Sequence, residues 1–198
     1  MMSKVTTRGD IVKAADDLFY RRGYEHTSFA DIAGVVKISR GNFYYYFKTK
    51  DQILDAVIDA RLVERRAMLE RWEAKGKTPE ERIRCFIDIL IVNGEQIKQF
   101  GCPVGTLASE LAKLGHDARG DANRLFSLFR TWLRRQFVAL GRKADADALA
   151  LHLLARSQGV AALANAFRDD RFIRREVQEM YAWLRDCANN ASPPEPDA

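Results

Sequence analysis

The segment 39–50, with the sequence SRGNFYYYFKTK, carries the side chains of this chain that are best suited to binding a nucleic acid. Arginine forms two parallel hydrogen bonds with guanine and asparagine does so with adenine, so Arg40 and Asn42 are candidates for reading bases. Gly41 lies between them and, having no side chain, lets the backbone come close to a ligand. The pattern predicts a helix that enters a DNA groove.

Hydroxyl and ammonium groups surround these candidates and suit the phosphate backbone, whose contacts fix register without reading sequence. Phosphate contacts are predicted for Thr27, Tyr44, Tyr45, Lys48 and Lys50. Tyr46 is predicted to contact either a base or a phosphate. Three successive side chains cannot all face one way on a helix, so one of the three tyrosines is expected to pack in the core.

Two short helices are needed to present these side chains. The first is predicted from N-cap candidates followed by apolar residues at helical spacing: Thr27, Ser28, Phe29, Ile32, Ala33 and Val36. The second begins at the N-cap candidate Ser39 and carries Phe43 and Phe47 four residues apart. Only Lys37 and Ile38 separate them, which predicts a helix-turn-helix. The alternative is an amphipathic helix pair with solvated charges and an aromatic core.

The charge distribution supports a polyanionic partner. Of the net charge of +5, residues 1–50 carry +4, from nine basic and five acidic side chains, and the other 148 residues carry +1. A basic N-terminal segment kept only for solubility would not need the motif.

The same residues resemble the TetR family of transcriptional regulators, through Thr27, DIA at 31–33, SRGNFYYYF at 39–47 and KTKDQIL at 48–54. The resemblance covers the first quarter of the chain, and beyond it only length and helical layout agree. The family usually has Gly where this chain has Lys37, and often His where it has Tyr46. A left-handed turn conformation costs a residue other than glycine some energy, so Lys37 bears on the turn geometry.

Helical periodicity continues through the chain without strand-like alternation, so the predicted fold class is all-α, with about nine helices. A first helix to about Arg22 and a long helix at 49–72 flank the motif, and further helices are predicted at 79–98, 103–114, 119–140, 145–167 and 170–189. The expected domains are an N-terminal three-helix helix-turn-helix domain (1–50), a larger helical ligand-binding and dimerisation domain (51–190) and a Pro-rich, disordered tail (191–198).

The helices near 145–167 and 170–189 each carry an apolar stripe, and the first contains Gly159, which permits close helix approach. In the family that the chain resembles, the last two helices build a homodimer. The alternative is an intramolecular core, which periodicity does not distinguish from an interface. A homodimer is favoured because one small helix-turn-helix reads too few bases for useful specificity.

The resemblance also implies a small-molecule cavity among the central helices. Its expected lining is Phe86, Phe100, Cys102, Phe126, Phe129, Trp132 and His152, although ordinary core packing explains the same residues. The helix dipole at Pro103 would make the Cys102 thiol reactive, and FGCPVGTLASEL resembles a segment in a family subset that includes regulators responding to electrophiles or oxidants. The alternative is a small buried cysteine in a tight corner.

Catalytic and metal-binding patterns were not found, so no enzyme, no metal site and no cofactor is predicted. The three cysteines are odd in number and none forms a CxxC pair, which favours a cytoplasmic location, and the short apolar run at 86–92 does not predict a membrane span. The predicted function is a ligand-responsive DNA-binding transcriptional regulator, a repressor released from a pseudo-palindromic double-stranded DNA operator by a small-molecule effector, which tilts the long helix. The alternatives are a non-specific architectural DNA-binding protein and a helical small-molecule-binding or catalytic protein.

Overall fold

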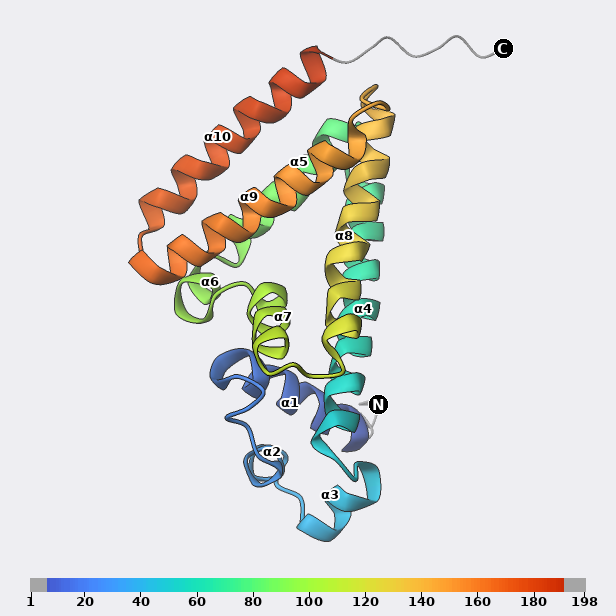
Figure 1. Cartoon of the computed structure of the whole chain (residues 1–198), viewed down its shortest axis with the longest axis vertical. Helices are drawn as coiled ribbons and strands as arrows, with labels where there is room; N and C mark the ends of the chain where they lie inside the picture. Colours follow the sequence, from blue (N-terminus) through green and yellow to red (C-terminus); the bar gives the residue numbers. More distant parts are fainter. Residues whose placement is uncertain (1–6, 191–198) are drawn as a thin grey trace, which may run out of the picture. The chain divides into compact units, whose positions relative to one another are not determined.

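The computed structural model describes residues 7–190, which contain ten α-helices and no β-strand, so the predicted all-α fold is confirmed. The tail expected at 191–198 lies outside the described residues. No helix within the described range is long and apolar enough to cross a bilayer. In chain order, as coloured in Figure 1, the helices are α1 (Thr7–Arg22), α2 (Phe29–Val36), α3 (Arg40–Tyr46), α4 (Lys50–Lys75), α5 (Pro79–Val92), α6 (Gly94–Phe100), α7 (Pro103–Lys113), α8 (Arg119–Ala139), α9 (Ala146–Phe167) and α10 (Asp170–Asn189).

The segment 79–98, expected to be one helix, is two helices that meet at Asn93. The N–H of Asn93 donates to the Ile89 carbonyl at 3.0 Å and closes α5, and Gly94 begins α6. Asn and Gly both have low helix propensity. Gly94 is also buried at a place where an added Cβ would lie 3.8 Å from Cδ1 of Ile173 in α10. Local propensity and close helix packing therefore both act at this break.

The described helices divide into two compact units. Unit 1 contains the chain up to Arg65 together with Pro103–Leu125, and unit 2 contains Arg66–Cys102 and the chain from Phe126 onward. α4 and α8 each contribute residues to both units. The expected functional boundary at residue 50 remains a proposal, because this grouping adds α7 and the first parts of α4 and α8 to the helix-turn-helix.

In unit 1, α1 packs against α2 and α7 through a buried face that includes Ile11, Ala15 and Phe19. The side chain of Arg61 in α4 is buried, and its guanidinium donates to the Asp16 carboxylate and to the Pro103 carbonyl, both at 2.6 Å. A buried charge is tolerated when it is paired and hydrogen-bonded in this way. Arg61 thus connects α1, α4 and the start of α7.

In unit 2, α10 packs against α5 and α9, and Figure 1 shows α9 and α10 side by side. The Tyr181 hydroxyl in α10 donates a hydrogen bond to Asp88 in α5, and burial raises the pKa of Tyr181 to about 12. The core between these helices is aliphatic: Ile83, Ile87, Leu90, Leu153, Val160, Ala164, Val177, Met180 and Leu184.

Candidate nucleic-acid interface

α2 and α3 form the predicted pair of short helices, each with a side-chain cap. The Ser28 hydroxyl accepts from the Asp31 N–H at 3.2 Å, and the Asp31 carboxylate accepts from the Ser28 N–H at 2.8 Å. The Ser39 hydroxyl accepts from the Asn42 N–H at 3.3 Å. The caps predicted at Ser28 and Ser39 are therefore confirmed. Such caps satisfy amide groups that a helix leaves unpaired in its first turn.

Lys37 ends α2 in the left-handed region, with φ 58° and ψ 43°. Its N–H and the N–H of Ile38 both bond to the Ala33 carbonyl, which closes the helix. This conformation costs a residue with a Cβ roughly 1–2 kcal/mol. The chain therefore makes the turn with lysine in a conformation that glycine adopts more easily.

The inward face of α3 fixes its orientation on α2. Phe43 and Phe47 are 1% and 2% exposed, and the Phe43 ring lies 5.0 Å from that of Phe29 in α2. At 3.6 residues per turn, the residues between these two point to other sides of the helix, and Tyr45, two positions from each, lies nearly opposite them. Burial of the two phenylalanines is thus what turns the remaining side chains of α3 outward.

The outward face of α3 carries the residues predicted to bind DNA. Gly41, Asn42, Tyr44, Tyr45 and Lys48 are all exposed. A Cβ added at Gly41 would meet nothing closer than the Ser39 hydroxyl at 4.0 Å, so the backbone there is open to a ligand. Arg40 is the first residue of α3, but its side chain lies outside the part of the chain that the structure describes.

None of the three consecutive tyrosines is buried, so the expectation of one core tyrosine is wrong. Tyr44 and Tyr45 are 45% and 78% exposed, and Tyr46 is half-buried with its ring 5.1 Å from that of Tyr45. The buried positions of α3 belong to Phe43 and Phe47, which leave no core site for a tyrosine.

Two residues expected to contact phosphate point into the protein instead. Thr27 is 1% exposed, and its hydroxyl donates to the Gly23 carbonyl at 2.8 Å. The Lys50 ammonium group donates to the carbonyls of Tyr24 and Glu25, at 3.0 and 3.4 Å. A phosphate contact donated by the Thr27 hydroxyl would require its bond to break, and the Lys50 ammonium group already uses two of its three N–H donors. The DNA-binding roles of both residues stay predictions.

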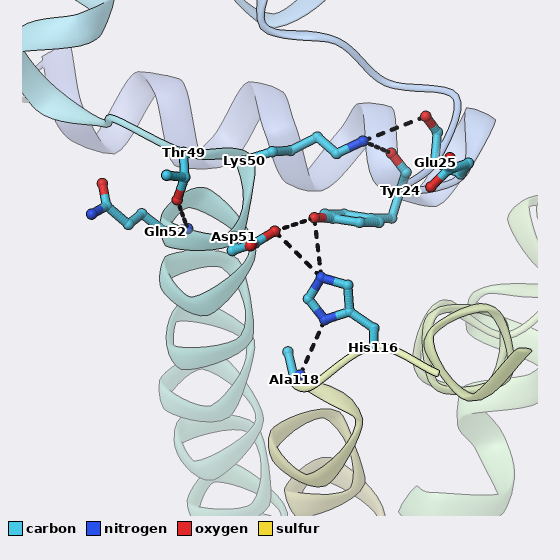
Figure 2. A network of polar contacts seen from close by, with 8 residues as sticks. All are labelled: Tyr24, Glu25, Thr49, Lys50, Asp51, Gln52, His116 and Ala118. Atoms are coloured by element: carbon cyan, nitrogen blue, oxygen red, sulfur yellow. Dashed lines mark hydrogen bonds and ion pairs between the residues drawn. The ribbon is translucent and has the colours of Figure 1, made fainter. Parts of the chain in front are cut away.

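Figure 2 shows a polar network around Tyr24, whose side chain lies against the first turn of α4. The Tyr24 hydroxyl donates to the Asp51 carboxylate at 2.5 Å, and Nε2 of His116 lies 3.2 Å from this hydroxyl and 3.3 Å from Asp51. Thr49 caps α4 by accepting from the Gln52 N–H at 3.2 Å. The network joins the α1–α2 turn, α4 and the α7–α8 loop.

Sequence reasoning did not find this network. His116 is 92 residues from Tyr24 and 65 from Asp51, so no local spacing brings them together. The first helix was expected to end near Arg22, which the structure confirms, and Gly23 follows it with a φ of 90°. The loop position of His116 carried no signal of its tertiary partners.

A hollow of about 470 Å³ lies beside the network and is strongly acidic. Burial and the neighbouring carboxylates raise the pKa of Asp55, whereas the hydrogen bond from Tyr24 lowers the pKa of Asp51. The pKa values of these two carboxyl groups, one turn apart in α4, are thus shifted in opposite directions. The lining of the hollow is Asp51, Asp55, Gly115, His116, Asp117, Ala118 and Asp121.

The residues predicted to line a ligand cavity belong to unit 2, and the structure brings only some of them together. The Phe86 and Phe129 rings lie 5.6 Å apart and are buried. Trp132 is buried against Trp72, and its N–H donates to Glu73 at 2.8 Å. The others are placed as follows: Phe100, Cys102 and Phe126 are half-buried, and His152 is exposed and lies against Trp183.

A groove of about 170 Å³ in unit 2 includes one of these predicted residues, Trp132. Oε1 of the buried Gln136, one turn further along α8, has no hydrogen-bond partner among the described residues, while its Nε2 donates to Glu73 at 3.4 Å. The groove is lined by Arg66, Leu69, Glu70, Glu73, Leu128, Thr131, Trp132 and Arg135. Charged side chains at its rim and a tryptophan inside it give it mixed polarity.

The outward face of α9 has a different character from that of α3. Leu151, Leu163 and Phe167 are 44%, 45% and 71% exposed. Four small exposed residues of the same helix lie three or four positions from these or from one another: Ala148, Ala155, Gly159 and Ala162. These residues recur every three or four positions, so they form one continuous stripe on the helix. We call these seven residues the α9 stripe.

The capped helix pair, its turn and its outward polar face define a helix-turn-helix protein. Residues 11–57 match the family described as bacterial regulatory proteins, tetR family. Residues 79–179 match the C-terminal domain of LmrA/YxaF-like transcriptional regulators. The chain therefore belongs to the TetR family of transcriptional regulators.

Individual relatives agree with this assignment. An uncharacterised HTH-type transcriptional regulator of Lactococcus lactis subsp. lactis is 30% identical over 167 residues, 82% of this chain and 85% of the relative. The regulator TtgR of Pseudomonas putida is 39% identical over 54 residues, 27% of this chain and 26% of the relative. A TetR regulator structure from Legionella pneumophila has a TM-score of 0.81 at 24% identity and covers 92% of this chain and 98% of its own.

Proposed function

We propose that the protein is a ligand-responsive repressor that acts in the cytoplasm and binds a pseudo-palindromic operator as a homodimer. The observation that carries this proposal is the outward face of α3, where exposed polar and aromatic side chains surround an open Gly41 backbone. In the proposed complex α3 enters the major groove, Arg40 and Asn42 read bases, and Tyr44, Tyr45 and Lys48 bind phosphates. Tyr46 borders this surface and contacts either a base or a phosphate.

The homodimer is proposed to form through α9 and α10, with the α9 stripe at its centre. A continuous apolar stripe exposed on a helix favours burial against another surface, and small residues let two helices approach closely. A second copy of the same chain supplies a complementary stripe through two-fold symmetry. Two α3 helices held in this way would read successive half-sites of one operator.

The effector is proposed to be a small molecule that binds in unit 2 among Phe86, Phe129, Trp132 and their neighbours. α4 runs without interruption from Lys50 to Lys75 and contributes to both units. A ligand that favours one tilt of α4 would shift the spacing of the two α3 helices and weaken operator binding by population shift.

A covalent trigger at Cys102 is the second form of this proposal. Cys102 is half-buried and directly precedes Pro103, the first residue of α7, as predicted. An electrophile or oxidant that modified the thiol would act where the chain passes from unit 2 to unit 1, because Cys102 is the last residue of its stretch of unit 2. Replacement by serine separates the two forms, because Cys102→Ser abolishes a covalent response and leaves non-covalent release unchanged.

Selection from a random duplex pool at fixed, near-physiological salt tests the proposed function. The expected product is a pseudo-palindromic consensus with half-sites about one helical turn apart. Salt-sensitive binding without an enriched sequence would instead support a non-specific architectural DNA-binding protein. Effectors are then screened by release of the fluorescent operator.

A further inference from the structure

We propose that Glu110, Lys50 and His116 are positioning residues for operator binding, which hold the segment Tyr24–Glu25 between α1 and α2 in one conformation. The inference rests on the proposed function, because it concerns how the DNA-binding helices are held. Glu110 and His116 come from α7 and the α7–α8 loop, far from the helix-turn-helix in sequence. We call these contacts the turn clamp.

Glu110 binds the two amide groups of the held segment. Its Oε2 accepts from the Tyr24 N–H and its Oε1 from the Glu25 N–H, both at 2.9 Å. Gly23 makes this approach possible, because a Cβ at that position would lie 2.8 Å from Oε1 of Glu110. Hydrogen bonds from backbone amides to a carboxylate are charge-assisted and stronger than neutral ones. One side chain of α7 thereby fixes two successive peptide units.

Lys50 binds the carbonyl groups of the same two residues. Its ammonium group donates to the Tyr24 and Glu25 carbonyls, and it also lies 4.2 Å above the centre of the Tyr24 ring. Both the donors and the acceptors of the segment are therefore bound by side chains from other helices. The sequence predicted a phosphate contact for Lys50, whereas in the structure its ammonium group binds backbone carbonyls of the same chain.

His116 and Asp51 hold the side chain of Tyr24, which is 4% exposed. Nδ1 of His116 accepts from the Ala118 N–H at 3.1 Å, so the proton of the neutral ring lies on Nε2. That Nε2–H faces both the Tyr24 hydroxyl and the Asp51 carboxylate (Figure 2). One ring nitrogen thus caps the start of α8 while the other supports the clamp.

Salt dependence of operator binding separates positioning from phosphate contact. The slope of log K against log salt is negative, and each lost phosphate contact makes it less steep by about 0.9, or by about 1.8 for two subunits. Lys50→Met is expected to weaken binding about tenfold with an unchanged slope, because it loosens the turn. A slope that is less steep by about 1.8 would identify Lys50 as a phosphate ligand and overturn its positioning role. Lys48→Met, the exposed neighbour, is the comparison variant.

Glu110→Gln tests the clamp without removing a positive charge. A glutamine has one acceptor oxygen where the carboxylate uses two, so operator affinity is expected to fall roughly tenfold with the slope unchanged. Affinity that stays within about twofold of the wild type would overturn the role of Glu110. Glu64→Gln, the same change of charge at an exposed residue of α4, controls for altered surface charge.

Two replacements of His116 separate its two nitrogens. Asparagine places an acceptor near the position of Nδ1 and keeps the Ala118 contact, whereas glutamine reaches the position of Nε2 and keeps the clamp. His116→Asn is expected to weaken operator binding more than His116→Gln. Equal losses, or a larger loss for glutamine, would reduce His116 to a cap for α8 and overturn its positioning role.

A measurement on the protein without DNA makes the failure of the clamp distinguishable from failure of the proposed function. In Glu110→Gln, hydrogen exchange at the Tyr24 and Glu25 amides is expected to become at least about tenfold faster, with the amides of central α1 unchanged. Unchanged exchange at these two amides would overturn the clamp whatever the DNA result. If the wild type selects no operator sequence, the proposed function fails, and the exchange result still decides whether the turn is held.

Discussion

The outward faces of α3 and α9 differ in chemistry, although both belong to one chain. Both helices bury apolar side chains on one side, Phe43 in α3 with Phe47 directly after it, and residues such as Leu153 and Val160 in α9. Their outward sides differ: α3 presents asparagine, tyrosines and a lysine, whereas the α9 stripe presents alanines, a glycine, leucines and a phenylalanine. The buried sides specify the fold, and the exposed sides indicate the chemistry of the partner.

The largest effect is expected from a bulky residue in the α9 stripe. A Cβ at Gly159 meets nothing within 4 Å, so Gly159→Trp folds normally as a subunit. Two symmetry-related indoles would overpack the interface, and the dimer dissociation constant is expected to rise on the order of 1000-fold. Sedimentation equilibrium measures this constant.

Gly120→Trp is the matched control for the α9 stripe, because Gly120 is also an exposed helical glycine with no neighbour within 4 Å of an added Cβ. Its dimer dissociation constant is expected to equal that of the wild type. Equal dissociation constants for both tryptophan variants would place the dimer interface elsewhere and break the comparison between α3 and α9.

On α3, Arg40→Ala and Asn42→Ala are expected to weaken operator binding about 10- to 100-fold and to relax selection at one base position in each half-site. The dimer should remain intact, because α3 lies outside the α9 stripe. Repeated duplex selection with each variant measures the change. An unaltered consensus for Arg40→Ala would remove that residue from base reading.

Thr27 sharpens the comparison, since it adjoins the DNA-binding helices yet points inward. Thr27→Val removes the hydrogen bond to the Gly23 carbonyl and is expected to lower the free energy of unfolding by about 1–2 kcal/mol. Operator affinity at fixed salt should not change. Urea denaturation measures the stability, and the exposed Thr131→Val serves as the neutral control. A loss of operator affinity by folded Thr27→Val at fixed salt would show that Thr27 contacts phosphate after all.

The smallest effect concerns the carboxylates of α4. The raised pKa of Asp55 means that its charged form is disfavoured on folding, so its ionisation lowers stability at neutral pH and the cost disappears as pH falls through that pKa. Asp55→Asn is therefore expected to raise the melting temperature at pH 7 by at most about 2 °C, with no gain below about pH 4.

Asp51 has the opposite sign and provides the internal check. Its lowered pKa gives stability above the unfolded value of about 3.9, which is lost as pH falls through the folded pKa. Asp51→Asn is thus expected to lower the melting temperature at pH 7 and to have little effect in strong acid. The melting temperature of each variant is measured between pH 3 and 7 and should approach that of the wild type as the pH falls. A difference from the wild type that does not change with pH would contradict both assignments.

Local sequence signals predicted the elements of this fold well. The caps at Ser28 and Ser39 depend on neighbouring residues, so the sequence alone predicts them. The break at Asn93 was missed, because the apolar pattern continues across it. The long helix was expected to end near Trp72 and continues to Lys75.

The direction of a side chain was harder to predict than its helix. Thr27 and Lys50 have types that suit phosphate, yet tertiary partners turn both inward. Glu110 was not singled out, since its partners are backbone amides 85 and 86 residues away. Backbone groups carry no residue identity, so no sequence pattern marks them as binding partners.

Unit 1 takes residues from two separate stretches of the chain, so the N-terminal helices alone do not contain all the contacts that hold the helix-turn-helix. A chimera that grafts residues 1–50 onto another regulator's body would leave behind Glu110, His116 and the Arg61 contact with Pro103. The chimera should show the operator specificity of this protein only when α7 is transferred together with residues 1–50, or when the recipient already carries equivalent side chains. To change the specificity of such a regulator, the part to exchange is therefore the whole of unit 1, including both of its stretches of chain.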